Sequence, residues 1–268
     1  MKRNLLALAL TAAFAAQAEV CTMFSKDSTC TFAGDTSGGQ VIYSNPTNLS
    51  NIGSGVITPF LGTQANGVQF GVSTDSPLVN TLPLNDKRDN INTFTNTFTQ
   101  NQLGVVTVGS TDYYQFFLDT NEPNSEAGKL ISIDTIRIWD AKSALLQLLD
   151  NTNITSIADV DVRFPSLIYA LGPTNSLVLN DSLFSGSGLG YDLSMLVPVS
   201  TFQNVALDSR LIFGTGMGQV EATSGGFEEW AYLAGTGPIP VIPEPSTALL
   251  AGLGLAVIGL MRFRRRAD

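Results

Sequence analysis

Hydrophobic and polar residues alternate in short stretches through the middle of the chain, and turn-forming residues separate these stretches. Alternation with a period of two is typical of strands that are buried on one face. We expect strands at 40–44, 56–61, 68–73, 105–108, 113–118, 130–139, 160–164, 167–171, 177–180, 192–197, 211–213 and 227–233. Only the segment 141–149 has apolar residues at helical spacing. The pattern predicts a mainly β fold, with residues 19–234 forming a single β-sandwich of jelly-roll type.

The strand expected at 130–139 contains a change of phase. Ile131 and Ile133 are apolar at odd positions, whereas Ile136 and Ile138 are apolar at even positions. A β-bulge between the two pairs would cause this change, because one extra residue turns every later side chain to the other face. A strand buried on both faces would have the same sequence, so both interpretations stay open.

The first residues have the parts of a secretory signal peptide. Two basic residues, Lys2 and Arg3, precede an apolar run at 5–16. Ala16 at the end of this run and Ala18 after it are small residues with the spacing of a cleavage site. This order predicts a signal helix over residues 1–18 that is removed before Glu19.

The last part of the chain differs in composition. A linker rich in Gly and Pro, at 235–242, precedes a turn formed by Pro243, Glu244 and Pro245. A hydrophobic helix is expected at 247–261. Its 14 residues at 248–261 have no charged or strongly polar side chain and would span ~21 Å as a helix, which is less than the ~30 Å of bilayer hydrocarbon. Four basic residues flank it at the end of the chain: Arg262, Arg264, Arg265 and Arg266. Because clustered arginines stay cytoplasmic, we expect transient insertion with the upstream domain outside.

This order of Pro-Glu-Pro, apolar segment and arginine cluster resembles the PEP-CTERM sorting signal of exosortase substrates in Gram-negative bacteria. The resemblance covers 241–266, and we assign 243–268 to the sorting signal. It implies that an exosortase-like membrane protease removes the tail after export across the inner membrane. The protein would then stay in the cell envelope, at the outer surface or outside the cell, in a setting tied to exopolysaccharide and biofilm.

Parts of the body also resemble surface proteins that carry the same tail. These parts lie at 113–123, 130–139, 186–202 and 226–230. The resemblance implies an extracellular β-sandwich of unassigned activity and supplies no catalytic residue.

Charge and composition narrow the possible functions. Between residues 19 and 245 there are 8 Lys and Arg against 22 Asp and Glu, a net charge of −14. Such an acidic surface is repelled by phosphate backbones, so we expect no nucleic-acid partner. The chain has no His, which excludes Ser-His-Asp and Cys-His catalysis and every His-ligated metal site. We therefore do not expect an enzyme.

Two cysteines, Cys21 and Cys30, remain after signal cleavage. In an oxidising compartment they have one possible internal pairing, and we expect a disulfide. A reactive or metal-binding pair is the alternative.

The densest polar cluster follows the expected strand at 113–118. Asp119, Asn121 and Glu122 offer carboxylate and amide oxygens on one loop, which are the ligands that Ca²⁺ prefers. The spacing does not fit an EF-hand, and an Asx/Pro turn between two strands is the other interpretation.

Two further motifs contain residues that could act in catalysis or ligand binding, but a structural role explains each of them better. Glu228 and Glu229 adjoin Trp230, yet neighbouring strand residues point to opposite faces, so the two carboxylates are not expected to act across one glycosidic bond. We expect Trp230 to pack in the core. The glycine-rich segments at 186–190 and 214–218 are expected to be turns or bulges, since neither precedes a nucleotide-binding strand–loop–helix unit.

Together these patterns favour a non-enzymatic exported protein of the cell surface or extracellular matrix. Two alternatives from other classes stay open: a carbohydrate-binding module stabilised by Ca²⁺, and a polysaccharide hydrolase that uses carboxylates.

Overall fold

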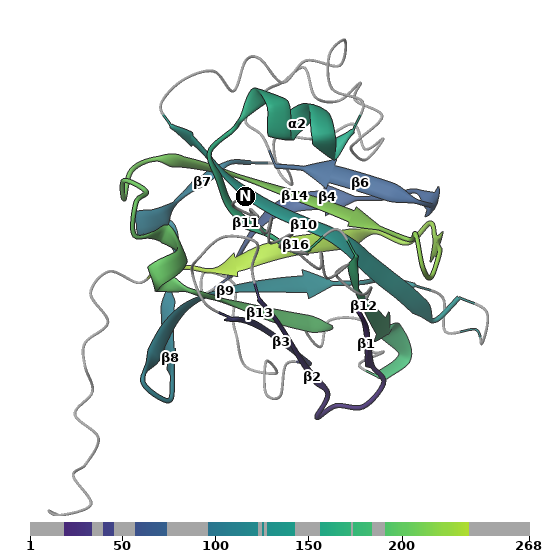
Figure 1. The fold of residues 1–268 in the computed structure, drawn as a ribbon. Helices are drawn as coiled ribbons and strands as arrows, with labels where there is room; N and C mark the ends of the chain where they lie inside the picture. The colour runs from purple at the N-terminus through teal and green to yellow at the C-terminus, as the bar shows by residue number, and fades with distance from the viewer. Residues whose placement is uncertain are drawn as a thin grey trace, which may run out of the picture. The chain divides into compact units, whose positions relative to one another are not determined.

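The protein is mainly β (Figure 1). The computed structural model describes residues 19–33, 40–45, 57–73, 96–122, 125, 128–142, 156–172, 174–183 and 191–235. A compact unit spans Met1–Gly235, and a second unit spans Thr236–Asp268. All described residues belong to the first unit.

A first seven-stranded sheet has the order β1-β12-β10-β14-β6, with β11 beside β10 and β7 beside β14. Its strands are β1 (Glu19–Met23), β6 (Gln69–Val72), β7 (Phe98–Thr99), β10 (Leu130–Lys142), β11 (Leu167–Ala170), β12 (Asn175–Asn180) and β14 (Arg210–Met217). The edge strand β1 runs parallel to β12, with Cys21 opposite Leu177. The other pairs in this sheet are antiparallel.

A second seven-stranded sheet has the order β2-β3-β13-β9-β16-β4, with β8 beside β9. Its strands are β2 (Thr29–Ala33), β3 (Gln40–Ser44), β4 (Ile57–Thr63), β8 (Val105–Val108), β9 (Thr111–Asp119), β13 (Leu193–Pro198) and β16 (Glu228–Leu233). All of its described pairs are antiparallel. The short strands β5 (Asn66–Gly67) and β15 (Thr223–Ser224) form a separate ladder.

One hydrophobic core lies between the two sheets. It takes side chains from both, and aromatic rings meet across the interface: the Phe213 ring centroid lies 5.3 Å from that of Phe60 and 4.8 Å from that of Trp230. Rings fully buried in this way stabilise the fold by roughly 3 kcal/mol each. Two sheets that share one core have the layered arrangement of a β-sandwich.

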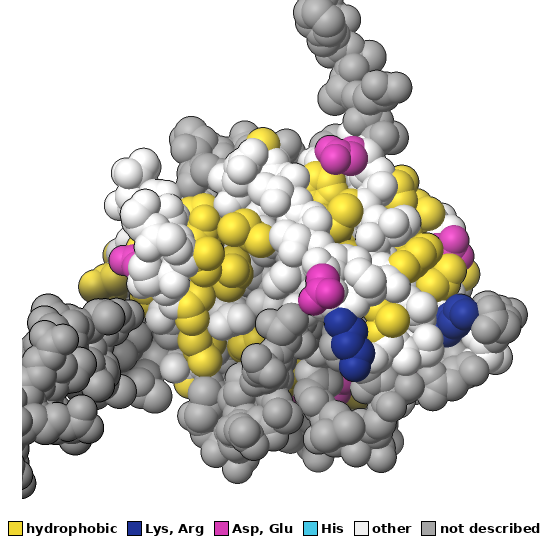
Figure 2. All heavy atoms as spheres, turned by 90° about the horizontal axis from the view of Figure 1, so that it is seen from below, with side chains coloured by type: hydrophobic (Ala, Val, Ile, Leu, Met, Phe, Trp, Pro, Cys, Tyr) yellow, Lys and Arg dark blue, Asp and Glu magenta, His cyan; other side chains and the backbone are white. Residues whose placement is uncertain are grey.

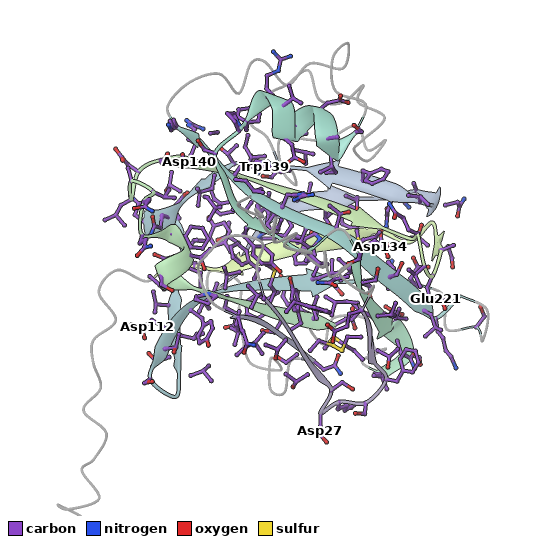
Figure 3. All side chains as sticks on the ribbon, viewed as in Figure 1. Asp27, Asp112, Asp134, Trp139, Asp140 and Glu221 are labelled. Atoms are coloured by element: carbon purple, nitrogen blue, oxygen red, sulfur yellow. A yellow bond between two sulfur atoms is a disulfide. The ribbon has the colours of Figure 1, made fainter. Side chains whose placement is uncertain are left out.

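The outer face of the first sheet has a smaller core. Trp139 packs there with Ile157, Val160 and Phe164, beneath helix α2 (Ile157–Arg163), and Figure 3 shows the labelled Trp139 close to that helix. The Trp139 indole donates a 2.9 Å hydrogen bond to Asp161. Three 3₁₀ turns complete the described elements: η2 (Gln100–Gln102), η4 (Asp181–Leu183) and η5 (Val199–Phe202).

The strand predictions are confirmed in most places and wrong at one. The strands expected at 40–44 and 105–108 have the observed bounds of β3 and β8. The strand expected at 160–164 is wrong, because those residues belong mainly to helix α2. Ser156 caps that helix: its side chain accepts a hydrogen bond from the Asp159 backbone N–H, and the Asp159 carboxylate accepts one from the Ser156 N–H. Strands β1, β2, β5, β7 and β15 were not predicted.

The bulge in β10 is confirmed. The register with β14 shifts between Ile133 and Thr135. As a result Ile131, Ile133, Ile136 and Ile138 all reach the core between the sheets, although their positions change parity. Strand β10 then continues to Lys142, so the predicted helix at 141–149 is wrong at its first two residues, and its remainder lies outside the described residues.

The prediction that both glycine-rich segments are turns or bulges is wrong for Gly214 and Gly216, which lie in β14. A Cβ at Gly214 would come within 2.7 Å of the Trp139 ring, so glycine here makes room for a side chain packed flat on the strand. Gly218 directly follows β14 and has φ at +90°, a conformation that favours glycine. The segment 186–190 lies outside the described residues.

In the described part of the chain, no helix is long and apolar enough to cross a membrane. Three predicted segments lie outside that part: the signal helix at 1–18, the hydrophobic helix at 247–261 and the linker at 235–242. The structure describes only the first residue of the linker, Gly235.

Candidate functional site

Acidic side chains gather where β9 ends and β16 begins. The antiparallel pairing of these strands places Asp119 directly opposite Glu229. Asp192, just before β13, donates its backbone N–H to the Leu118 carbonyl at 2.8 Å, and Asp181 begins η4. We call this region the acidic end of the second sheet.

The outer group of the acidic end is built around Thr120. Its hydroxyl oxygen lies 2.7 Å from Asp181 Oδ1 and 2.8 Å from Asp192 Oδ2, and its backbone N–H donates to the same Asp192 oxygen at 2.7 Å. All three residues are buried. The hydroxyl has one proton, so both contacts are hydrogen bonds only when a carboxyl group also carries a proton. Burial raises the pKa of Asp192 to about 7, against the opposing effect of these hydrogen bonds.

Asp119 and Glu229 complete the outer group. Asp119 is exposed, yet its pKa is raised to about 6. Desolvation of its carboxyl group by the surrounding protein is the main cause, and the negative charges of Glu229 and Asp181 add to it. Burial is the main cause that raises the pKa of the Tyr191 phenol, and the negative charges of Glu229 and Asp119 add to it. Like charges thus accumulate on this face of the second sheet, which favours bound protons or cations.

The inner group points into the sandwich. Glu228 is fully buried, and its carboxyl group is in hydrogen-bonding contact with that of Glu122, which is 5% exposed. The Gln69 amide on β6 donates a 2.6 Å hydrogen bond to Glu228 Oε2, and the Ser224 backbone N–H donates to Glu122 Oε2 at 2.8 Å. Burial is the main cause that raises the pKa of Glu228 to about 9, and Glu122 adds to it.

The structure separates the three residues predicted to bind Ca²⁺. Asp119 lies on the outer face of the second sheet beside Glu229, whereas the Glu122 side chain turns inward to Glu228. Asn121 is exposed, and its carbonyl oxygen packs against Gly226. Within the described ranges, no group of three or more Cys, Asp or Glu side chains is arranged to hold a metal ion.

The two glutamates beside Trp230 point to opposite faces of β16. Glu228 and Trp230 are fully buried, whereas Glu229 is half-buried on the outer face. Retaining and inverting glycosidases both need two carboxylates on either side of one bond. Glu228 and Glu229 do not have that arrangement.

Sequence reasoning missed Asp181, Asp192 and Gln69. Each is far from Asp119 and Glu228 along the chain; Gln69 is 159 residues from Glu228. The available signal was local: Asp181 directly follows the expected strand at 177–180, and Asp192 is the first residue of the one at 192–197.

Cys21 and Cys30 form a disulfide, with their Cα atoms 6.2 Å apart. It joins β1 of the first sheet to β2 of the second, so it connects the two layers at one edge of the unit.

A buried carboxylate fixes the bulge of β10. Asp134 accepts hydrogen bonds from the Ser132 hydroxyl at 2.8 Å, the Ser176 hydroxyl at 2.9 Å and the Gln219 backbone N–H at 2.8 Å. Figure 3 shows Asp134 and Glu221 at the same end of the unit, and the Glu221 N–H donates to the Ser132 hydroxyl at 3.0 Å. All of these partners are protein groups, so Asp134 has a structural role.

A surface pocket of about 340 Å³ lies between β10, β11 and η5. Hydroxyl and amide side chains line much of it, together with one acid and one base: Asp140, Lys142, Ser166, Ser200, Thr201, Gln203 and Asn204. Asp140 is already engaged, because its Oδ1 accepts from the Lys142 N–H and the Ser209 hydroxyl. The pocket thus offers mainly neutral hydrogen-bonding groups.

Among the described atoms on the face seen in Figure 2, hydrophobic side chains and atoms that carry no charge predominate, and charged side chains are few. This visible face has no basic band of the kind that follows a phosphate backbone.

The residues of the predicted sorting signal lie outside the described part of the chain. They are Pro243, Glu244, Pro245 and the arginines at 262, 264, 265 and 266. Comparison with curated proteins and with solved structures gives no match. Residues 241–266 match a family model, the PEP-CTERM protein-sorting motif. The chain therefore carries a PEP-CTERM protein-sorting motif at residues 241–266, and this motif supports sorting by an exosortase-type system.

Proposed function

We propose that the protein is a non-enzymatic component of the cell envelope or extracellular matrix, associated with exopolysaccharide after its tail has been removed. The observation that carries this proposal is the sorting motif at 241–266, which follows a compact β unit that ends at Gly235. An exosortase-like membrane protease is the processing partner. The disulfide between Cys21 and Cys30 suits an oxidising compartment outside the cytoplasm.

A structural rather than catalytic role has two supports. The chain contains no His, and the two adjacent glutamates beside Trp230 face opposite sides of their strand. A hydrolase that used Glu228 would also have to open the core, since that side chain is fully buried.

Polysaccharide association has one structural support. The pocket between β10, β11 and η5 presents hydroxyl and amide groups, which pair well with the hydroxyl groups of neutral sugars. Gln203 and Asn204 are the residues we assign to such contacts.

Intact-mass measurement of protein recovered from cells tests the processing. We expect an N-terminus near Glu19 and loss of the residues after Pro245. The Glu244→Ala variant should keep its tail, whereas Pro240→Ala, one residue before the matched motif, should be processed like the wild type. Mature wild-type protein that retains the complete tail would contradict the proposal.

Affinity electrophoresis through the native exopolysaccharide tests the association. The proposal expects retardation of the wild type, weaker retardation of the Asn204→Ala variant, and no shortening of the polymer. Retardation that disappears in EDTA would favour a carbohydrate-binding module stabilised by Ca²⁺, and shortening of the polymer would favour the hydrolase. Unretarded migration would remove the polysaccharide from the proposal and leave the sorting untouched.

A further inference from the structure

Buried side-chain oxygens without a hydrogen-bond partner gather at one end of the core. Within the described residues, five of these oxygens belong to Thr63 on β4, Gln69 on β6, Glu122 after β9, Thr215 on β14 and Glu228 on β16, and a sixth belongs to Gln100 on η2. Each of these side chains is at least nine-tenths buried. Buried polar atoms in folded proteins almost always have partners, so a group of them in one place indicates a missing ion or water.

The strand register shows that these oxygens are neighbours. Glu228 pairs with Thr63, so the two side chains lie on the same face of the second sheet. A Cβ at Gly71 would meet the Thr63 side chain, so this face of β6 points at β4. Gln69 is two residues before Gly71 and shares its face, and its amide nitrogen contacts Glu228.

Within the part of the chain that the structure describes, the two carboxyl groups have no cationic partner. Among the described residues, neither Glu122 nor Glu228 forms an ion pair with Lys or Arg. In the described part of the chain, the donors that reach them are the Gln69 amide and the backbone N–H groups of Ser224 and Glu228, and all three are uncharged. Two adjacent buried carboxylates cannot both be ionised without a compensating charge.

We propose that Glu122 and Glu228 bind a divalent cation of the Ca²⁺ type between the two sheets, with Gln69 Oε1 and Thr63 Oγ1 as neutral ligands. The donor set is all oxygen, which suits Ca²⁺ and disfavours Zn²⁺. Two carboxylates balance the charge of one such ion. The site needs no third acidic residue, in keeping with the absence of a three-acid group in the described part.

Such an ion would connect the sheets at the edge opposite the disulfide. The disulfide joins β1 to β2, whereas Gln69 on the edge strand β6 faces β4 and β16 at the other end of both strand orders. The cytoplasm holds little free Ca²⁺, so a site with an affinity typical of extracellular modules, Kd ~10⁻⁴–10⁻³ M, would fill only after export. This inference does not depend on the polysaccharide proposal.

Thermal unfolding of the full chain in detergent, in EDTA and in about 5 mM CaCl₂, tests the site. We expect Ca²⁺ to raise the Tm of the wild type by about 5 °C. The Glu228→Gln variant should fold, since its amide can donate to Glu122 as a protonated acid does, but it should lose the rise. Asp27→Asn is the control: it removes one exposed carboxylate on the β1–β2 connection, outside both acidic groups, and should keep the rise.

Terbium luminescence gives a second readout that needs no variant. Tb³⁺ substitutes for Ca²⁺, and Trp230 lies two residues from Glu228 on the same face of β16, close enough to sensitise emission. We expect emission that saturates at one ion per chain and is removed by excess Ca²⁺. A wild-type Tm that does not respond to Ca²⁺, or a rise that persists in Glu228→Gln, would overturn the proposal. A proton shared between Glu122 and Glu228 would then satisfy both carboxyl groups.

Discussion

Cys21 and Cys30 connect an edge strand of one sheet to an edge strand of the other. The closed loop is short, with a sequence separation of 9, so the entropic stabilisation is at the modest end of the usual range. Apart from this bond, the contact between the two edge strands depends on side-chain packing. Met23 at the end of β1 and Phe32 in β2 are both in the core.

We predict that the Cys21→Ser/Cys30→Ser double variant unfolds more easily than the wild type. Loss of the cross-link should lower the free energy of unfolding by about 2–3 kcal/mol, which corresponds to roughly 5–10 °C in Tm. Circular dichroism during heating measures the change. A reductant should lower the wild-type Tm by a similar amount and leave the double variant unchanged. A double variant as stable as the oxidised wild type would contradict the prediction.

The contact of Thr120 with Asp181 and Asp192 predicts a pH dependence of stability. The pKa of Asp192 is about 7 in the folded protein, above the ordinary value of 3.8, so the folded state binds this proton more tightly than the unfolded state does. Stability should therefore fall as pH rises from about 4 to about 7. Asp119 and the buried Glu228, with pKa values of about 6 and about 9, act in the same direction, and Asp181 and Glu229 are the carboxylates that face Asp119 and Asp192.

Urea unfolding in EDTA at several pH values measures this slope. Asp192→Asn removes the titrating group and keeps an oxygen that accepts the Thr120 N–H, so the slope between pH 5 and pH 7.5 should flatten. Asp27→Asn, at an exposed position on the β1–β2 connection, should leave the slope unchanged. Stability that rises with pH over this interval in the wild type would show that Asp192 is ionised throughout.

The hydrogen bonds of Asp134 predict a large effect of a single substitution. Asp134→Ala removes the acceptor for two hydroxyls and one backbone N–H, and the donors lie in a buried region. We expect a loss of about 3 kcal/mol in the free energy of unfolding. Asp27→Ala is the control, because that side chain is exposed, and Figure 3 labels both residues. A loss below about 0.5 kcal/mol for Asp134→Ala would show that the turn at 218–221 does not depend on this carboxylate.

The strands were predictable where local pattern determined burial. At 40–44, Val41 and Tyr43 are buried and their neighbours are more exposed, as their alternation predicts. In β10 the change of parity between Ile133 and Ile136 indicated the bulge, because packing all four isoleucines in one core requires the extra residue. The edge strand β1 gave a weak signal, since only Met23 among its five residues is buried.

The candidate site was less predictable because nonlocal pairing assembles it. Glu122 was predicted to be a Ca²⁺ ligand together with its neighbours Asp119 and Asn121, but the fold directs its side chain to Glu228. No local rule places Gln69 beside a residue 159 positions away. What the sequence could show was the opposite orientation of Glu228 and Glu229, which follows from the geometry of any strand.

The error at 160–164 leads to a last prediction. Val160, Val162 and Phe164 alternate like strand residues, but the hydrogen bonds between Ser156 and Asp159 start a helix at Ile157, three residues before the expected strand. Ser156→Ala removes the side-chain half of this capping box and should lower the free energy of unfolding by about 1 kcal/mol, or roughly 2–4 °C in Tm. Val162 is 85% exposed on the same helix, so Val162→Ala removes a β-branched side chain without a packing loss and should raise stability by a few tenths of a kcal/mol. Opposite signs for the two variants would show that helix formation, and not burial alone, stabilises this segment over Trp139. Equal destabilisation by both would contradict this prediction.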